Sequence, residues 1–139
     1  MPAPTPTLNP QTPESPVFQK YTLSGVDFNA LGDNQVPISL SEFVSRYQVL
    51  NVWVTNASAT IVTATAGLFT AAYAQGFAIG PSQILAITNN TADNIGNAQS
   101  MELANQRTIV FSDMTLYFNV STVEGTAAKA DVHIMIQLL

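Results

Sequence analysis

One histidine and a nearby aspartate are the residues of this chain whose types and spacing could support catalysis. His133 is the sole histidine, and Asp131 lies two residues before it. Residues two apart on a strand share a face, so this carboxylate could orient the imidazole as a general base. Such a base would still need a nucleophile, and the sequence has neither a cysteine nor a Gly-X-Ser-X-Gly turn. We therefore interpret His133 as a residue that faces solvent or an interface, and we expect no enzymatic activity.

The carboxylates do not follow a metal-binding pattern. The nine acidic residues are spread along the chain, and the absence of cysteine excludes thiolate ligands. The segment Asp27–Asp33 carries oxygen ligands suited to calcium, but it lacks the spacing of an EF-hand loop. Asn29, Asp33 and Asn34 are more simply explained as turn-forming residues. We predict that the chain uses no metal or other cofactor.

Aromatic side chains suggest a second kind of site, a platform for stacking against a ligand such as a carbohydrate. Trp53 and Tyr117 are the candidates, because each lies on the face of a predicted strand opposite the core. Tyr47, Tyr73 and Phe69 are further aromatic residues that could contribute. The alternative is that these rings fill the core or a subunit interface.

Charge is scarce and excludes several classes of partner. Only 9% of residues are charged, and four of them are basic. These are too few to follow a phosphate backbone, so we expect no nucleic-acid partner. The net charge of −5 argues against anionic membrane surfaces, and no apolar run approaches the ~20 residues of a spanning helix. An apolar chain with few charges is expected to bury surface against other subunits, which predicts a homo-oligomer.

Proline divides the chain into two parts. Six of the eight prolines fall within the first sixteen residues, where they exclude helix and central strand. We predict an extended arm over residues 1–17, with a reach on the order of 50 Å, and a body over residues 18–139. The alternative is a tail that stays disordered without a partner. The residues expected to contact a partner, in the arm and at its junction with the body, are Pro4, Pro6, Leu8, Pro10, Val17 and Phe18.

The body alternates apolar and polar residues with a period of two, which predicts about eight short strands. The clearest are Tyr47–Asn56, Thr115–Ser121 and Lys129–Leu138, and Val36–Leu40 is a predicted edge strand because it contains Pro37. The expected fold is all-β, an antiparallel β-sandwich or jelly roll with an extended proline-rich N-terminal arm.

Several local expectations accompany this fold. Val123–Ala128 is predicted to join the last two strands as a hairpin. Ala59–Ala66 reads as a further strand, and Ala98–Ala104 contains helix-forming residues. A helical turn over Ser41–Arg46 and a strand over Thr108–Ser112 are also expected. In the strand that begins at Tyr47, one face should carry Leu50, Val52 and Val54, and the other Tyr47, Val49, Asn51 and Trp53.

Three segments resemble the accessory structural proteins of tailed bacteriophage virions, namely head decoration (cement) proteins and minor capsid or fibre-base proteins. They are Tyr21–Gly25, the small-residue run Ala66–Tyr73 and the closing segment Leu116–Leu139. The resemblance implies a virion subunit, often trimeric, that binds the major capsid protein or other virion subunits. The alternative is a receptor- or carbohydrate-binding module of a virion fibre or tail.

Overall fold

The structure is a computed structural model that describes residues 17–40, 46–87, 99–104 and 111–139. Within these ranges it contains strands and no helix. The strands are β1 (Val17–Asp27), β2 (Gly32–Pro37), β3 (Tyr47–Thr55), β4 (Thr65–Ala71), β5 (Gln75–Ile84), β6 (Gln99–Ser100), β7 (Thr115–Thr122) and β8 (Lys129–Leu138).

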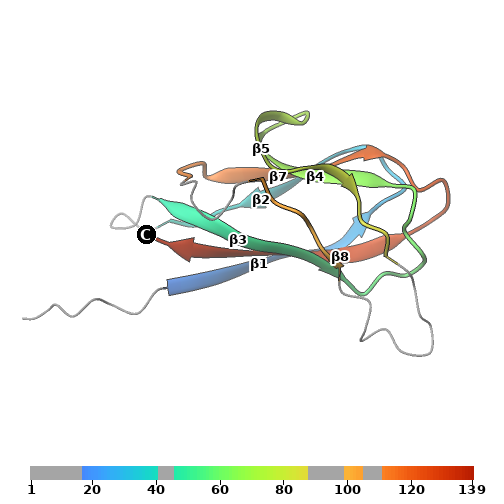
Figure 1. Cartoon of the computed structure of the whole chain (residues 1–139), viewed down its shortest axis with the longest axis horizontal. Coiled ribbons are helices and arrows are strands. Elements are labelled where there is room, and N and C mark those ends of the chain that lie inside the picture. The colour runs from blue at the N-terminus through green and yellow to red at the C-terminus, as the bar shows by residue number, and fades with distance from the viewer. Residues whose placement is uncertain (1–16, 41–45, 88–98, 105–110) are drawn as a thin grey trace, which may run out of the picture.

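These strands form two antiparallel sheets that pack face to face (Figure 1). Sheet A has the order β1-β8-β3-β6, and sheet B has the order β2-β7-β4-β5. Strands from the two ends of the chain are therefore partners: β1 pairs with β8, β2 with β7, β3 with β6 and β4 with β5. A long antiparallel ribbon rolled up in this way is a jelly roll, so the predicted fold class is confirmed.

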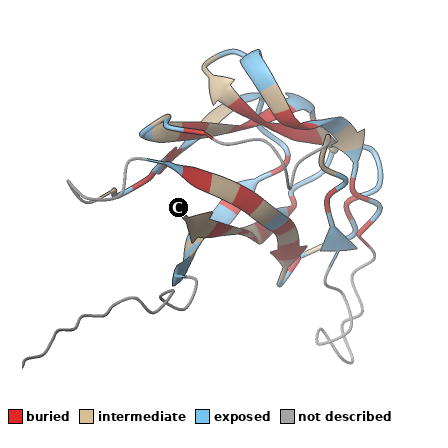
Figure 2. Cartoon of the chain, turned by 60° about the vertical axis from the view of Figure 1, so that its left-hand side comes forward, coloured by how far each residue is buried: buried red, intermediate tan, exposed pale blue. Residues whose placement is uncertain are grey.

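The core lies between the two sheets, as the buried segments in Figure 2 show. In β8, Ala130, Val132, Ile134 and Ile136 are buried and alternate with half-buried residues, as the period of two predicts. β7 contributes to the core from the other sheet. The ring of its Phe118 packs edge-on against the ring of Phe28, with the ring centroids 5.9 Å apart. The two sheets thus share one continuous core.

Two glycines occupy positions in β4 and β5 where a Cβ atom would clash. A Cβ atom on Gly67 would lie 2.7 Å from the carbonyl oxygen of Gly80 and 2.9 Å from the amide nitrogen of Ser82. A Cβ atom on Gly80 would lie 2.9 Å from the sulfur of Met101. Gly67 is therefore required by the close approach of the β4 and β5 backbones, and Gly80 by the packing of the Met101 side chain.

The facing of β3 differs from the sequence prediction. Tyr47 and Val49 were expected opposite Val52 and Val54, but all four side chains are buried. The pairing of β3 with β8 is irregular between Val49 and Asn51, which places one extra residue, Leu50, in the strand. Such a bulge resets the alternation, so both halves of the strand turn the same kind of residue inward.

The predicted hairpin over Val123–Ala128 is wrong. β7 belongs to sheet B and β8 to sheet A, so this segment crosses from one sheet to the other. It is held at the crossing by Phe28, whose N–H donates to Ala128 O and whose carbonyl accepts from Glu124 N, both at 2.9 Å. The two strands are adjacent in sequence, but each has a better partner from the opposite end of the chain.

Other elements also differ from the sequence prediction in type or in their boundaries. Ala59–Ala66 is not a strand: it forms a single bridge from Ile61 to Ile87, and β4 begins at Thr65. β2 lies at a sheet edge as predicted, but it spans Gly32–Pro37 and so takes up part of the expected turn. The helix-forming run Ala98–Ala104 contains the short strand β6 instead. Most of the expected helical turn over Ser41–Arg46 and most of the expected strand over Thr108–Ser112 lie outside the described residues.

Candidate functional site

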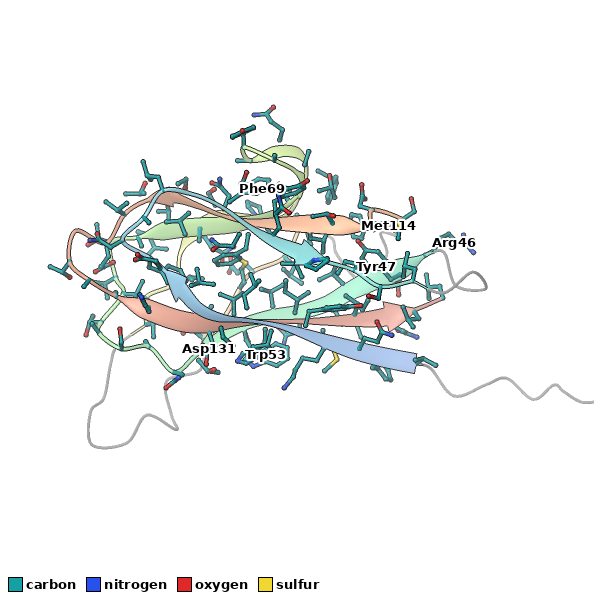
Figure 3. All side chains as sticks on the ribbon, turned by 180° about the vertical axis from the view of Figure 1, so that it is seen from behind. Arg46, Tyr47, Trp53, Phe69, Met114 and Asp131 are labelled. Atoms are coloured by element: carbon teal, nitrogen blue, oxygen red, sulfur yellow. The ribbon has the colours of Figure 1, made fainter. Side chains whose placement is uncertain are left out.

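The outward side of sheet A carries the residues that the sequence marked for chemistry. Alternate side chains of β1, β8 and β3 point away from the core, and the strand register aligns them in rows. We call this surface the Trp53 face, made up of Lys20, Thr22, Asn51, Trp53, Thr55, Asp131, His133 and Met135. Figure 3 shows Trp53 and Asp131 on this outer side of the sheet.

His133 lies at the centre of this face between two threonines. Its Nδ1 lies 3.0 Å from Thr22 Oγ1 on β1, and its Nε2 lies 2.7 Å from Thr55 Oγ1 on β3. The imidazole also stacks on Trp53, with ring centroids 5.1 Å apart and planes 23° from parallel. Because both ring nitrogens already have hydroxyl partners, the imidazole is held in one orientation.

Asp131 does not act as the partner of His133. Its Oδ1 accepts the N–H of Gly25 at 2.8 Å, and its Oδ2 accepts a bond from Asn56 Nδ2 at 3.3 Å. Gly25 has a φ of +64° at the irregularity between Leu23 and Val26, so the carboxylate secures a bulge in β1. The geometry therefore gives the aspartate a structural role and does not assemble the general-base pair that the sequence raised as an alternative.

The environment of His133 favours its neutral form. Burial lowers the pKa of His133 below its ordinary value of 6.5, and the positive charge of Lys20 lowers it further. The negative charge of Asp131 acts in the opposite direction but does not cancel these effects. At neutral pH the face therefore presents a neutral imidazole, an indole ring and hydroxyl groups.

Tyr117, the other candidate for a ligand platform, lies on the opposite side of the molecule. It belongs to β7 and points outward from sheet B, where Phe69 and Gln35 are its neighbours in the register. The structure therefore does not bring Trp53 and Tyr117 together. Phe69 lies beside Tyr117 yet is buried, and Figure 3 shows it close to the hairpin that joins β4 and β5.

The partner-binding residues of the arm are described only in part. Val17 and Phe18 are the first two residues of β1, and their side chains are 51% and 52% exposed. They pair with Leu138 and Gln137 on β8. Pro4, Pro6, Leu8 and Pro10 lie outside the described residues.

Neither a metal centre nor a membrane span is found in the part of the chain that the structure describes. No group of three or more histidine, cysteine, aspartate or glutamate side chains is close enough to hold a metal ion there. Asp27 instead accepts the N–H of Asn29 at 2.8 Å, as expected of a turn. Within the same ranges, no helix is long and apolar enough to cross a membrane.

Sequence reasoning missed two features of the surface. Glu124 accepts the N–H groups of Val62, Thr63 and Ala64 at 2.8 to 3.1 Å, which joins two connections far apart in the sequence. Tyr73 lies at the tip of the β4–β5 hairpin with a positive φ of 60° and is 83% exposed. Neither has a sequence signal, because a lone glutamate and a Tyr-Ala pair are not typical of a loop clamp or a tight turn.

Comparison with known proteins assigns no family. No family model matches the sequence, and no curated protein matches it. Among solved structures, a chain of turnip yellow mosaic virus superposes with a TM-score of 0.32 and 16% sequence identity, over 95% of this chain and 86% of that one. A superposition this loose carries no functional inference.

Proposed function

We propose that this chain is a non-enzymatic structural protein of a virion, a capsid decoration (cement) protein that binds a capsid lattice through its N-terminal arm and its apolar β body. Its partners would be the major capsid protein or other virion subunits, and the protein itself would be a homo-oligomer, with a trimer favoured.

The strand order supports this proposal at the level of architecture. Jelly rolls of two four-stranded sheets occur in viral capsid proteins, and also in lectins and cupins. Because a fold does not determine function, the choice among these classes depends on the surface. No metal-binding cluster of the cupin kind is present among the described side chains.

The observation that carries the proposal is the place where the arm joins the body. The proline-rich segment leads directly into β1, and β1 is the terminal strand of sheet A. An edge strand offers unpaired N–H and C=O groups to another chain. Val17 and Phe18 add exposed apolar side chains at the same point. An extended segment that begins here can clasp a neighbouring subunit by strand addition, and repetition on a lattice multiplies weak contacts.

Deletion of residues 1–16 tests the role of the arm. Because β1 begins at Val17, this truncation leaves every described strand intact. We expect unchanged circular dichroism and at least about tenfold weaker co-sedimentation with undecorated capsid shells, since the apolar and backbone contacts of the arm are lost. If the truncated chain binds shells as tightly as the full chain, the arm is not the binding element.

A matched pair of point variants tests whether binding to shells depends on the arm junction or on exposed apolar side chains in general. Phe18→Ser removes an exposed ring at the junction, whereas Val62→Ser changes a side chain of similar exposure, 48%, in the connection between β3 and β4. We expect the first variant to weaken binding to shells and the second to leave it unchanged. Equal effects would contradict a localised binding site.

The Trp53 face supports a second candidate function, a receptor- or carbohydrate-binding module of a virion fibre or tail. A stacked indole surrounded by fixed hydroxyl and imidazole groups provides an apolar surface together with oriented polar contacts. Trp53→Ala should abolish binding on a glycan array, and Tyr117→Ala on the opposite sheet is the control. Absence of binding by the unmodified protein across a broad array would exclude this function.

A further inference from the structure

The tip of the β4–β5 hairpin presents one aromatic side chain to solvent. Tyr73 is 83% exposed, the largest exposed fraction among the large hydrophobic residues in the described ranges. The hairpin projects from the outer face of sheet B (Figure 1). A tyrosine displayed in this way is typical of an anchor that becomes buried in a protein interface.

The backbone at this tip is strained. Tyr73 and Ala74 both lie in the left-handed region, with φ of 60° and 57°, and Gln75 N donates to Ala72 O at 3.3 Å. Positive φ at both central residues defines a type I′ turn, for which Asn-Gly is the favoured sequence. A large aromatic residue here costs folding energy that a glycine would not, which points to a use for the ring.

Side chains of the body hold the tip in place. Asp33 on β2 accepts the N–H of Tyr73 through Oδ2 at 2.9 Å and a bond from Asn119 Nδ2 through Oδ1 at 2.7 Å. The base of the hairpin is secured where Phe77 N donates to Thr70 Oγ1 at 2.8 Å. A tip that is already ordered loses little conformational entropy when it binds.

A shallow pocket of about 250 Å³ lies further along β5, between this edge strand of sheet B and the segment that follows β6. Its walls are fixed, because the Gln83 amide donates to Glu102 O at 2.9 Å and accepts from Glu102 N at 2.8 Å. The pocket is smaller than the ~300–1,000 Å³ that holds drug-sized ligands, and so suits a single side chain. It is lined by Pro81, Ser82, Gln83, Glu102, Leu103 and Ala104.

The chemistry of the pocket fits a tyrosine. Pro81, Leu103 and Ala104 provide apolar surface for a ring. The carboxylate of Glu102, an exposed side chain on the wall, can accept a hydrogen bond from a phenol hydroxyl. Tyr73 of the same copy does not occupy this pocket, because its side chain is exposed and its backbone is tied to β2 at the far edge of the sheet.

We propose that Tyr73 of one copy inserts into the Pro81–Ala104 pocket of a second copy, so that this protein associates head to tail through sheet B. Tyr73 and the pocket are separate surfaces of each copy, and in this arrangement the contact is heterologous, with Tyr73 of each copy in the pocket of the next. Repetition then gives a closed ring if the rotation between copies closes, and a filament if it does not. This contact needs neither the arm nor a capsid, so it can fail or hold independently of the proposed function.

Thiol cross-linking tests the contact directly, because the chain has no cysteine. Ala72→Cys places a thiol beside the tyrosine, and Ser82→Cys places one on the pocket wall. We expect a short thiol-to-thiol linker to join these two variants when they are mixed. Ala72→Cys mixed with Ala127→Cys, an exposed position on the β7–β8 connection, is the control and should give no specific product. Equal yields from the two mixtures would overturn the proposal.

Two glycine variants distinguish the contribution of the Tyr73 ring from that of the strained turn. Tyr73→Gly relieves strain and removes the ring, whereas Ala74→Gly relieves strain and keeps it. We expect Tyr73→Gly to abolish the cross-link and to weaken self-association in sedimentation velocity by at least about tenfold, the loss typical of an interface anchor. Ala74→Gly should retain both. A chain that remains monomeric over the whole concentration series, or association that survives Tyr73→Gly, would refute the contact.

Discussion

Glu124, Asp131 and Asp33 each hold backbone N–H groups of a segment that is distant in sequence. Glu124 binds residues 62–64, Asp131 binds Gly25, and Asp33 binds Tyr73. Hydrogen bonds to an ionised carboxylate are stronger than neutral ones. These three acidic residues, which look scattered in the sequence, therefore join segments of the chain that are far apart in sequence.

Glu124 should make stability depend on acid pH. Burial raises the pKa of Glu124, but hydrogen bonds from the N–H groups of Ala64, Thr63 and Val62 outweigh this and lower it below the ordinary value of 4.5. Because the unfolded chain then binds the proton more readily, this stabilisation is complete above pH 4.5 and is lost as the pH falls through the folded-state pKa. Glu124→Gln should remove this loss in urea unfolding measured across the acid range.

Glu102→Gln is the matched control for that experiment. Gln83 bonds the backbone of Glu102 and not its carboxylate, so this variant should keep the pH profile of the unmodified protein. The same acid dependence in Glu124→Gln would show that other groups cause it.

Protonation of His133 should change the fluorescence of Trp53, the only tryptophan in the chain. Its ring stacks on Trp53, and its pKa is lowered by burial and by Lys20. The unfolded chain therefore binds the proton more readily just below pH 6.5, so stability falls as the pH drops from that value through the folded-state pKa. We expect the emission of the folded protein to titrate with a midpoint below 6.5, and His133→Gln to abolish the transition.

Substitution of Lys20 tests whether its positive charge lowers the pKa of His133. Lys20→Gln removes the neighbouring positive charge and should move the fluorescence midpoint upward, toward the ordinary pKa of histidine. Lys129→Gln, four residues before His133 on β8 and not among the charges that shift its pKa, should leave the midpoint unchanged. A midpoint that does not respond to Lys20→Gln would mean that burial alone lowers this pKa.

At the scale of strands, irregularities decide which side chains face the core. The bulge at Leu50 turns Tyr47 and Val49 inward, where the Tyr47 hydroxyl donates to Asp113 O at 2.6 Å. The close approach of β4 and β5 depends on glycine at position 67. The alternating pattern predicts which segments form strands, but these local irregularities determine which side chains point into the core.

Gly67→Ala and Gly80→Ala should differ in cost although both positions lie in the same pair of strands. A Cβ on Gly67 meets two backbone atoms and the Phe69 ring within 2.9 Å, and backbone cannot give way. A Cβ on Gly80 meets the flexible side chain of Met101 first. We expect losses of about 3 kcal/mol for Gly67→Ala and about 1 kcal/mol for Gly80→Ala in denaturant unfolding. Equal losses would contradict the backbone clash.

At the scale of the whole molecule, pairing between the two ends of the chain makes folding a single event. β1 pairs with β8 and β2 with β7, so neither sheet is complete until the C-terminal strands arrive. The long-range pairings predict folding on the millisecond-to-second scale typical of such topologies. One core shared by both sheets predicts one cooperative transition.

Phe118→Ala tests this cooperativity across the sandwich. The ring belongs to sheet B and is fully buried against Phe28, so its loss should cost about 3–5 kcal/mol. We expect the fluorescence of Trp53, which lies in sheet A, to report the same loss as hydrogen exchange in β7. A Trp53 transition that is unaffected would show that the two sheets unfold independently.

The sequence by itself determined the all-β class, the inward residues of β8 and the outward placement of Trp53 and Tyr117. Each of these follows from alternation along one strand, which is a local property. The hairpin over Val123–Ala128 was predicted from the same local signals and is wrong, because strand pairing depends on which distant segments meet.

Tertiary structure alone decided the pairing order, the bulge in β3 and the partners of the polar residues. His133 was predicted beside Asp131, yet its contacts are Thr22 and Thr55, which come from two other strands. The conformation of Tyr73 depends on a left-handed backbone and on a hydrogen bond to the carboxylate of Asp33, forty residues away. The residues next to Tyr73 in the sequence predict neither feature. Local periodicity fixes which way a side chain points, whereas what it meets depends on long-range packing.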